Sequence, residues 1–545
     1  MRISRRTLER SELFLVSLFL IFCSSLLFNS MRKQLGFSDE TLYLILAHNA
    51  DTSISYGGLW SFYTHYLYVV AGQDIFIFRV LGGLILLGVA LIFGYSSIFS
   101  QQNAPAFSKS ERVIGALAIG LSSLFLYQRF IFTPGYDWLA FTGVLIALCG
   151  YANYQNSKRK IAVLSATCFG FGIFVSTMGR PVAGLILVIF LITDSKLSRH
   201  KTNFAFLAKY ALATMSALVV IHLLFIADFK DSLASINLTK LIASSDPSHS
   251  FSTILKSSVV QYLQIPWMAL SITFGSLGLL VVIGFLTRLQ SQRINIQIVK
   301  RVVLTTVIVE FLVISLYYLT SKHGQVLNFA WVTIFLTSLA LLWIDRNLPD
   351  QKVENLTREN SGTLGWISML GGLVALTFTS NIRFNELSQI FLLFYVAGCF
   401  LISAKIRKLV ARNFLNQLVL VFLLISFSHL MIIRSIQHYD SASLASQNQL
   451  TTVGPTNSKL LLDEQRALDV AKVREFRDSL SLRRAPILLN LTPVALYMNY
   501  ELGFRNVETP LLLNQRIANQ IIENNVEELR DAWLLTTSSA YRTVP

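Results

Sequence analysis

Charged residues are scarce in this 545-residue chain. They make up 14% of it, and apolar residues make up 53%, whereas about 25% of an ordinary soluble domain is charged. The length alone would allow several globular domains, but this composition excludes most such arrangements. The apolar residues form runs of roughly 20, the length at which a helix crosses the hydrocarbon core of a bilayer. We therefore expect a polytopic membrane protein.

Cysteine is also rare, and its placement is informative. The four cysteines all lie inside apolar runs, where a thiol behaves as a small apolar side chain. This excludes a disulfide framework and a cysteine-rich metal site. A zinc-binding helix motif, a phosphate-binding loop, a dinucleotide fingerprint and a nucleophile elbow are also missing from suitable contexts, and no aromatic-interleaved basic patch indicates nucleic-acid binding.

The apolar runs predict an all-α membrane fold with thirteen crossings. Lys and Arg are concentrated in the N-terminal tail and in alternate short loops, so the positive-inside rule places the N-terminus in the cytoplasm. We expect the basic start of the chain and the first run to form an uncleaved signal anchor. The crossings are predicted at residues 12–30, 75–99, 113–132, 138–154, 161–178, 181–194, 206–227, 264–287, 302–319, 326–344, 363–380, 388–404 and 413–433.

An odd number of crossings places the C-terminal part of the chain outside. We expect residues 1–433 to form the transmembrane domain, with long outer loops at 31–74 and 228–263. Residues 434–545, where charged residues return, should form a small extracytoplasmic α/β domain, because a segment of this length can bury a core of its own. Its predicted elements are amphipathic helices at Leu460–Leu480 and Leu513–Asp531 and strands at Ile487–Leu491 and Trp533–Thr537.

Two adjacent carboxylates, Asp39 and Glu40, begin a helical pattern in the first outer loop. One interpretation is purely structural: Ser38 caps the helix and the acids complement its dipole. The other is functional, because carboxylates at the mouth of a helix bundle can act as a general base or bind a divalent cation. The aromatic residues Tyr43 and Trp60 follow in the same loop and are candidates for substrate binding.

A second acidic candidate, Asp137, lies in a short turn that is predicted on the same side of the membrane. An aspartate at this position can simply cap the following helix. The candidates for binding an anionic group share that side: Arg129, Arg180, Lys322, His323 and Arg383. Each can instead be an interfacial cation that snorkels to the headgroups. Arg180 is the strongest of them, because it is enclosed between two apolar helices and arginine binds phosphate in a bidentate manner.

These motifs resemble those of the GT-C glycosyltransferases. The basic N-terminus, the acidic pair after the first crossing and the terminal outer domain are similar to the bacterial branch that is related to protein O-mannosyltransferases and lipid A aminoarabinose transferases. The matching segments are FSDETLY at residues 37–43 and TPGYDWL at residues 133–139. Over the first 200 residues or so the resemblance has local detail, and beyond them it is one of topology alone.

The resemblance implies a bacterial inner-membrane enzyme that transfers a sugar from a polyprenyl-phosphate carrier to a lipid, glycan or protein acceptor on the outer face. Asp39 would be the base, Glu40 its neighbour, Asp137 a second acid and Arg180 a ligand of the carrier phosphate. If the enzyme uses a divalent cation, Mg²⁺ or Mn²⁺, Asp39 and Asp137 would bind it. The fuller first-loop pattern of the lipid A enzymes, with further Lys and Pro residues, is missing here, so the acceptor stays open.

Three other functions remain open at this point. A transporter or flippase for lipid-linked glycans would carry its polar residues at midplane depth, whereas here they gather at the predicted outer mouth. A polymerase or ligase for surface polysaccharide would also use lipid-linked donors. A non-catalytic assembly factor would tolerate the loss of every loop carboxylate.

Overall fold

The described part of the chain is predominantly helical, and its core is a set of long apolar helices. The computed structural model describes residues 5–36, 39–48, 58–99, 107–129, 131–155, 159–197, 203–233, 235–237, 256, 260, 331–332, 334–335, 338–339, 341–342, 364–378, 390–406, 409–436, 446–479, 487–490, 500–501, 505–506 and 533–535. The crossings predicted at 264–287 and 302–319, and much of the one at 326–344, lie outside these residues.

Helices coincide with the other ten predicted crossings. They are α1 (Arg5–Ser30), α4 (Ile75–Phe93), α5 (Lys109–Ser123), α6 (Tyr136–Gln155), α7 (Arg159–Gly179), α8 (Ala183–Leu197), α9 (Phe204–Ile221), α14 (Trp366–Thr377), α16 (Leu393–Ala404) and α17 (Leu409–Ile436). Short π- or 3₁₀-helical turns extend three of them: η1 (Gly94–Ile98) after α4, η2 (Leu124–Arg129) after α5 and η3 (His222–Ile226) after α9.

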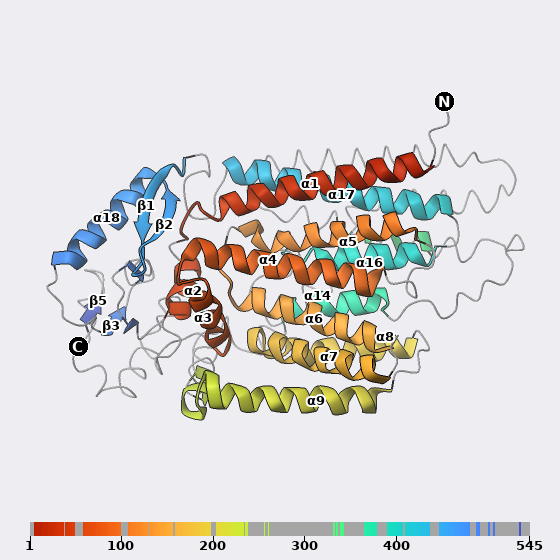
Figure 1. The fold of residues 1–545 in the computed structure, drawn as a ribbon, viewed down its shortest axis with the longest axis horizontal. Coiled ribbons are helices and arrows are strands. Elements are labelled where there is room, and N and C mark those ends of the chain that lie inside the picture. Colours follow the sequence, from red (N-terminus) through yellow and green to blue (C-terminus); the bar gives the residue numbers. More distant parts are fainter. Residues whose placement is uncertain are drawn as a thin grey trace, which may run out of the picture.

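Within the described residues, five helical stretches are long and apolar enough to cross a membrane. They are Leu13–Ser30, Ile75–Ile98, Lys109–Tyr127, Ile161–Gly179 and Phe204–Ile226. The helices run side by side as a bundle, with α1 along α17 at one edge and α9 at the other (Figure 1). The all-α membrane architecture predicted from the apolar runs is confirmed to this extent.

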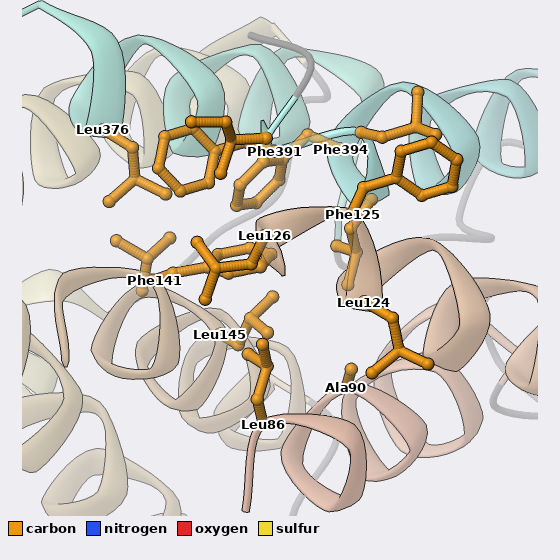
Figure 2. Close-up of a cluster of buried hydrophobic side chains, with 14 of the residues drawn as sticks. Leu86, Ala90, Leu124, Phe125, Leu126, Phe141, Leu145, Leu376, Phe391 and Phe394 are labelled. Atoms are coloured by element: carbon orange, nitrogen blue, oxygen red, sulfur yellow. The ribbon is translucent and has the colours of Figure 1, made fainter. Parts of the chain in front are cut away.

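The centre of the bundle is an apolar core built from helices that are far apart in the chain. Leu86 on α4, Phe125 on η2 and Phe141 on α6 converge with Phe391 and Phe394 from the α16 region (Figure 2). The ring centroids of Phe141 and Phe391 lie 5.1 Å apart in an edge-to-face arrangement, a geometry that stabilises aromatic pairs beyond simple burial. This core fixes α4 and α6 relative to the later helices.

Glycines allow α6 and α7 to approach with backbones in contact. A Cβ atom added at Gly172 would lie 2.2 Å from the backbone N of Ala147, and one added at Gly143 would lie 2.3 Å from the backbone N of Ser176. Small residues serve this purpose widely in membrane helix pairs. The close contact brings the first turn of α6 next to the end of α7, and each of these two places carries a residue of the candidate site.

Gly172→Ala is therefore expected to lower the free energy of unfolding by about 1–3 kcal/mol, because the backbone of α6 has to move away. Gly88→Ala on α4 is the matched control, since its added Cβ meets nothing within 4 Å and alanine favours a helix over glycine. Thermal unfolding of both variants in the same detergent measures the difference. Equal melting temperatures for the two would contradict the close α6–α7 packing.

The first loop contributes two short helices, α2 (Asp39–His48) and α3 (Trp60–Val70). They lie at one end of the bundle, between it and the C-terminal elements, while the N-terminus of α1 is at the opposite end (Figure 1). We call the end that carries α2 and α3 the domain end. The first loop and the C-terminal part of the chain are thus on the same side, as the crossings predict.

The C-terminal elements combine a hairpin, a helix and a small parallel sheet. Strand β1 (Gln449–Val453) pairs antiparallel with β2 (Ser458–Leu462), and α18 (Glu464–Ser479) follows. A three-stranded parallel sheet has the order β4-β3-β5, formed by β3 (Ile487–Asn490), β4 (Arg505–Asn506) and β5 (Trp533–Leu535). We refer to the described residues from 446 onward as the C-terminal segment.

One predicted element of this segment was partly wrong. The helix predicted at Leu460–Leu480 begins only at Glu464, because residues 458–462 form β2. In that strand Ser458, Leu460 and Leu462 are buried in alternation, which is the period of a strand rather than a helix. The strands predicted at 487–491 and 533–537 are present as β3 and β5. The helix predicted at Leu513–Asp531 lies outside the described residues, and the division into domains at residue 433 stays a prediction.

Candidate functional site

Glu40, the second residue of α2, is buried at the domain end and is surrounded by hydrogen-bond donors. Its Oε1 accepts from Thr133 Oγ1 at 2.8 Å and from the backbone N–H groups of Phe132 and Thr133, each at 3.2 Å. Its Oε2 accepts from the backbone N–H of Gly36 at 2.9 Å. The side chain is 1% exposed. Glu40 therefore joins the first loop to the turn that precedes α6.

Arg79, in the first turns of α4, provides the opposite charge. Its Nη2 lies 3.0 Å from Oε1 of Glu40, and its side chain is fully buried. The same guanidinium donates from Nη1 to the carbonyl of Met31 at 2.6 Å and from Nη2 to that of Gln34 at 3.0 Å. A buried ion pair needs such additional hydrogen bonds to offset its desolvation. The Arg79–Glu40 pair thus connects α4, α2 and residues 31–34.

Arg79 is not among the site residues predicted from the sequence, because it lies within the apolar crossing predicted at 75–99. One signal was available, because a charged side chain inside an apolar run has to find a partner in the interior. The sequence alone does not show that this partner is Glu40, which is 39 positions earlier in the chain.

A second ion pair joins Asp137 and Arg180. Arg180 donates to Oδ1 of Asp137 from Nε at 2.8 Å and from Nη2 at 2.5 Å. Asp137 is in the first turn of α6 and Arg180 directly follows α7. The two positions meet because the helices touch at this end: a Cβ added at Gly179 would lie 2.5 Å from the backbone N of Ala140.

The environment keeps Arg180 charged. Burial lowers the pKa of the Arg180 guanidinium, but the Asp137 carboxylate, its hydrogen bond to Arg180 and the side chains of Tyr136 and Tyr43 together raise it by more, so the pKa lies above its ordinary value. The side chain of Arg180 is 4% exposed, whereas that of Asp137 is 22% exposed. The pair is therefore a fixed cation and carboxylate at the edge of the bundle, with its acidic member reachable from solvent.

Three aromatic rings lie next to this pair. Tyr43 from α2 is 5.3 Å from Trp60 of α3 and 5.9 Å from Tyr136 of α6, measured between ring centroids in edge-to-face arrangements. The guanidinium of Arg180 lies 5.2 Å from the centroid of the Tyr136 ring, within the range of a cation–π interaction. Gly135 leaves room for the Tyr43 ring, because a Cβ atom added at Gly135 would lie 2.7 Å from that ring.

Helix α2 links the two ion pairs. Glu40 and Tyr43 are three residues apart and thus neighbours on the helix surface. Glu40 contacts residues 132 and 133, and Tyr43 contacts Tyr136, so α2 lies along the chain that leads into Asp137. Asp39 is the first residue of α2 and precedes Tyr43 by one helical turn. Its side chain is outside the described residues.

The side chains of four other predicted site residues lie outside the described part of the chain. Arg129 ends η2, and its side chain is not described. Lys322, His323 and Arg383 also lie outside the described residues. Within the described part of the chain, no three His, Cys, Asp or Glu side chains gather in a way that could hold a metal ion.

A divalent cation at Asp39 and Asp137 therefore stays a prediction. The described side chains offer it a single carboxylate, that of Asp137, which is already neutralised by Arg180. Hard cations such as Mg²⁺ prefer several oxygen ligands. The described residues therefore do not fit a metal centre.

The comparisons with known proteins found similarity only at the level of structure. No protein-family model matches the sequence, and no curated protein matches it either. The structure is similar to that of ArnT from Cupriavidus metallidurans bound to undecaprenyl phosphate, with 10% identity, coverage of 97% of this chain and 90% of that chain, and a TM-score of 0.41. For ArnT in the apo state these values are 11%, 96%, 90% and 0.39.

Proposed function

We propose that this protein is a membrane glycosyltransferase that moves a sugar from a polyprenyl-phosphate carrier to an acceptor hydroxyl. The observation that carries the proposal is the Arg180–Asp137 pair beside the aromatic rings of Tyr43, Trp60 and Tyr136. It places a fixed cation and flat apolar surfaces at the end of a bundle of apolar helices. A lipid phosphate that carries a sugar needs this combination.

In this proposal the reaction is a displacement at the anomeric carbon with inversion. Asp39 accepts the proton of the acceptor hydroxyl, whose oxygen attacks the anomeric carbon. The bond between that carbon and the phosphate oxygen breaks, and polyprenyl phosphate leaves with the bonding electrons. A cation held beside the leaving group stabilises the charge that develops there. Asp137 orients the guanidinium of Arg180 for this purpose.

Glu40 has a different part in the proposal. It accepts four hydrogen bonds and pairs with a buried arginine, so both of its carboxylate oxygens are already engaged by donors from the protein. We therefore assign Glu40 to holding α2 in place and Asp39 to proton transfer. The aromatic rings would pack against the sugar or the first isoprene units.

We also propose how the protein is oriented in the membrane. The N-terminus would be cytoplasmic and the domain end extracytoplasmic, in a bacterial inner membrane, as the distribution of Lys and Arg predicts. The donor would then enter from the outer leaflet, with its phosphate level with α2 and its chain among the helices. The sugar and the acceptor are left open by this arrangement.

The direct test uses purified protein in lipid nanodiscs with a panel of polyprenyl-phosphate sugars and measures the release of free polyprenyl phosphate. We expect release from at least one donor, and a loss of about 100-fold or more in Arg180→Gln, by analogy with the removal of an oxyanion-stabilising donor. Arg32→Gln is the matched control, because this exposed arginine at the same end contacts the ring of Phe76. Its rate should stay within twofold of the wild type. Equal rates for the two variants would exclude Arg180 from the site.

A further inference from the structure

Residues 31–36, which lead into α2, are held by hydrogen bonds at every carbonyl. The guanidinium of Arg79 donates hydrogen bonds to the carbonyls of Met31, Lys33 and Gln34. The carbonyl of Gly36 accepts from the backbone N–H and the hydroxyl of Thr41. The two other carbonyls, those of residues 32 and 35, accept hydrogen bonds from the C-terminal segment. A connecting segment with every carbonyl assigned to a partner is strongly determined in position.

The C-terminal segment supplies those partners through β2 and α18. The backbone N–H of Leu461 donates to the carbonyl of Arg32 at 2.9 Å, and the N–H of Gln34 donates to the carbonyl of Leu461 at 2.8 Å. Together they form a short parallel bridge between residues 33 and 461. Nη1 of the buried Arg466 donates to the carbonyl of Leu35 at 2.5 Å. Strand β2 thus adds residues 32–34 to its edge.

The backbone at Gln34 is an independent sign that this segment is constrained. Its φ is 65°, a left-handed conformation that costs a residue other than glycine roughly 1–2 kcal/mol. Such conformations persist where the surroundings over-determine them, and they are common next to functional sites. Here the surroundings are Arg79 on one side and Leu461 on the other.

The C-terminal segment also contacts the chain before α4, at a place that does not lead into α2. The hydroxyl of Thr456 donates to the carbonyl of Gln73 at 2.8 Å, and the backbone N–H of Ile75 donates to Ser458 Oγ at 3.0 Å. The hydroxyls of Tyr68 and Tyr500 lie 3.1 Å apart. The segment is therefore docked at two separate places, and only one of them touches residues 31–36.

We infer that the contact of Leu461 and Arg466 with residues 32–35 is a positioning device for α2, and that the C-terminal segment thereby sets the geometry of the candidate site. The path is short. Residue 35 is followed by Gly36, whose N–H donates to Glu40 and whose carbonyl accepts a hydrogen bond from the N–H of Thr41. Arg466 is thus a positioning residue, and the catalytic part of this inference rests on the proposed function.

The test is hydrogen–deuterium exchange of the full-length protein in nanodiscs, combined with the kinetics of polyprenyl phosphate release. In Arg466→Ala the amides of residues 36–44 should exchange at least tenfold faster, while those of α4 stay unchanged. The value of kcat should fall about tenfold, with KM for the donor within twofold. Arg466→Lys keeps a cationic donor and should restore both measurements to within threefold of the wild type.

Thr456→Val is the matched control, because it removes a hydrogen bond of the second docking place and leaves residues 32–35 untouched. It should not change exchange at residues 36–44. Unchanged exchange there in Arg466→Ala would overturn the inference, as would an equal increase in Thr456→Val. If α2 responds as expected but the wild type releases no polyprenyl phosphate from any donor, the positioning role is supported and the proposed function fails.

Discussion

Asp39→Asn should lower the rate of sugar transfer by about 10³-fold, because general-base catalysis contributes roughly 10²–10⁴-fold. Asparagine has the size of aspartate and can accept hydrogen bonds, but it cannot take up the proton of the acceptor hydroxyl. The loss should fall on kcat, with KM for the donor changed only slightly, since in the proposed mechanism the carrier phosphate would be bound by Arg180 rather than by Asp39. The measurement is steady-state transfer by protein in nanodiscs.

The stability of this variant separates a catalytic from a structural role. Asp39 is the first residue of α2, and removing a negative charge from the first turn of a helix costs only about 0.3–1 kcal/mol. A rate loss of three orders of magnitude with an almost unchanged melting temperature would therefore indicate chemistry. A melting temperature that falls together with the rate would indicate that Asp39 mainly supports the helix.

Asp74→Asn is the control for the carboxylate itself. Asp74 lies at the end of the same loop and caps α4 by accepting from the backbone N–H of Ile77 at 2.9 Å. Asparagine caps a helix about as well as aspartate, so this variant should keep its transfer rate to within twofold. Asp39→Asn with the activity of Asp74→Asn would show that Asp39 is not the base.

Arg79→Met is expected to lower the free energy of unfolding by about 3–5 kcal/mol, because it leaves the buried carboxylate of Glu40 without its cation. Three backbone carbonyls of residues 31–34 lose their donor at the same time. Thermal or denaturant unfolding in one detergent measures the effect. Arg112→Met is the matched control: its side chain donates to the carbonyl of Phe107 at 3.2 Å, and its loss should cost about 1 kcal/mol.

A double-mutant cycle identifies the ion pair as the cause. In Arg79→Met with Glu40→Gln no charge is left unpaired, so the double variant should be less destabilised than the sum of the two single variants, by about 0.5–3 kcal/mol. Strictly additive effects would mean that the two side chains act independently. An Arg79→Met variant as stable as Arg112→Met would remove the pair from any account of how α2 is held.

The long helices were accessible from the sequence because their signal is local. A run of roughly 20 apolar residues needs no partner to be recognised, and α1, α4, α5, α7 and α9 coincide with predicted crossings. Strand β2 shows the opposite case. Residues 460–462 of this strand were predicted as the start of a helix, but β2 pairs with β1 and with residues 32–34, and such pairing is a tertiary property.

In the candidate site, too, the sequence predicts the residue types, and the packing of the helices sets their distances. The sequence placed Asp137 and Arg180 on one side of the membrane, but their distance depends on how closely α6 and α7 pack, and that is set by Gly143, Gly172 and Gly179. From the sequence, Asp39 and Glu40 were predicted together as one acidic pair of the candidate site. The structure encloses Glu40 with Arg79, an arginine that no local pattern connects to it.

From its sequence alone, this protein was determined to be a helical membrane protein with acidic and aromatic residues in the first loop, because run length and composition act through the chain's local contact with the bilayer. Only the tertiary structure decided which carboxylate is bound in a buried ion pair, which cation faces the aromatic rings and which part of the C-terminal segment holds the start of α2. Those outcomes depend on desolvation and on donors supplied from distant positions, and both exist only once the helices have packed.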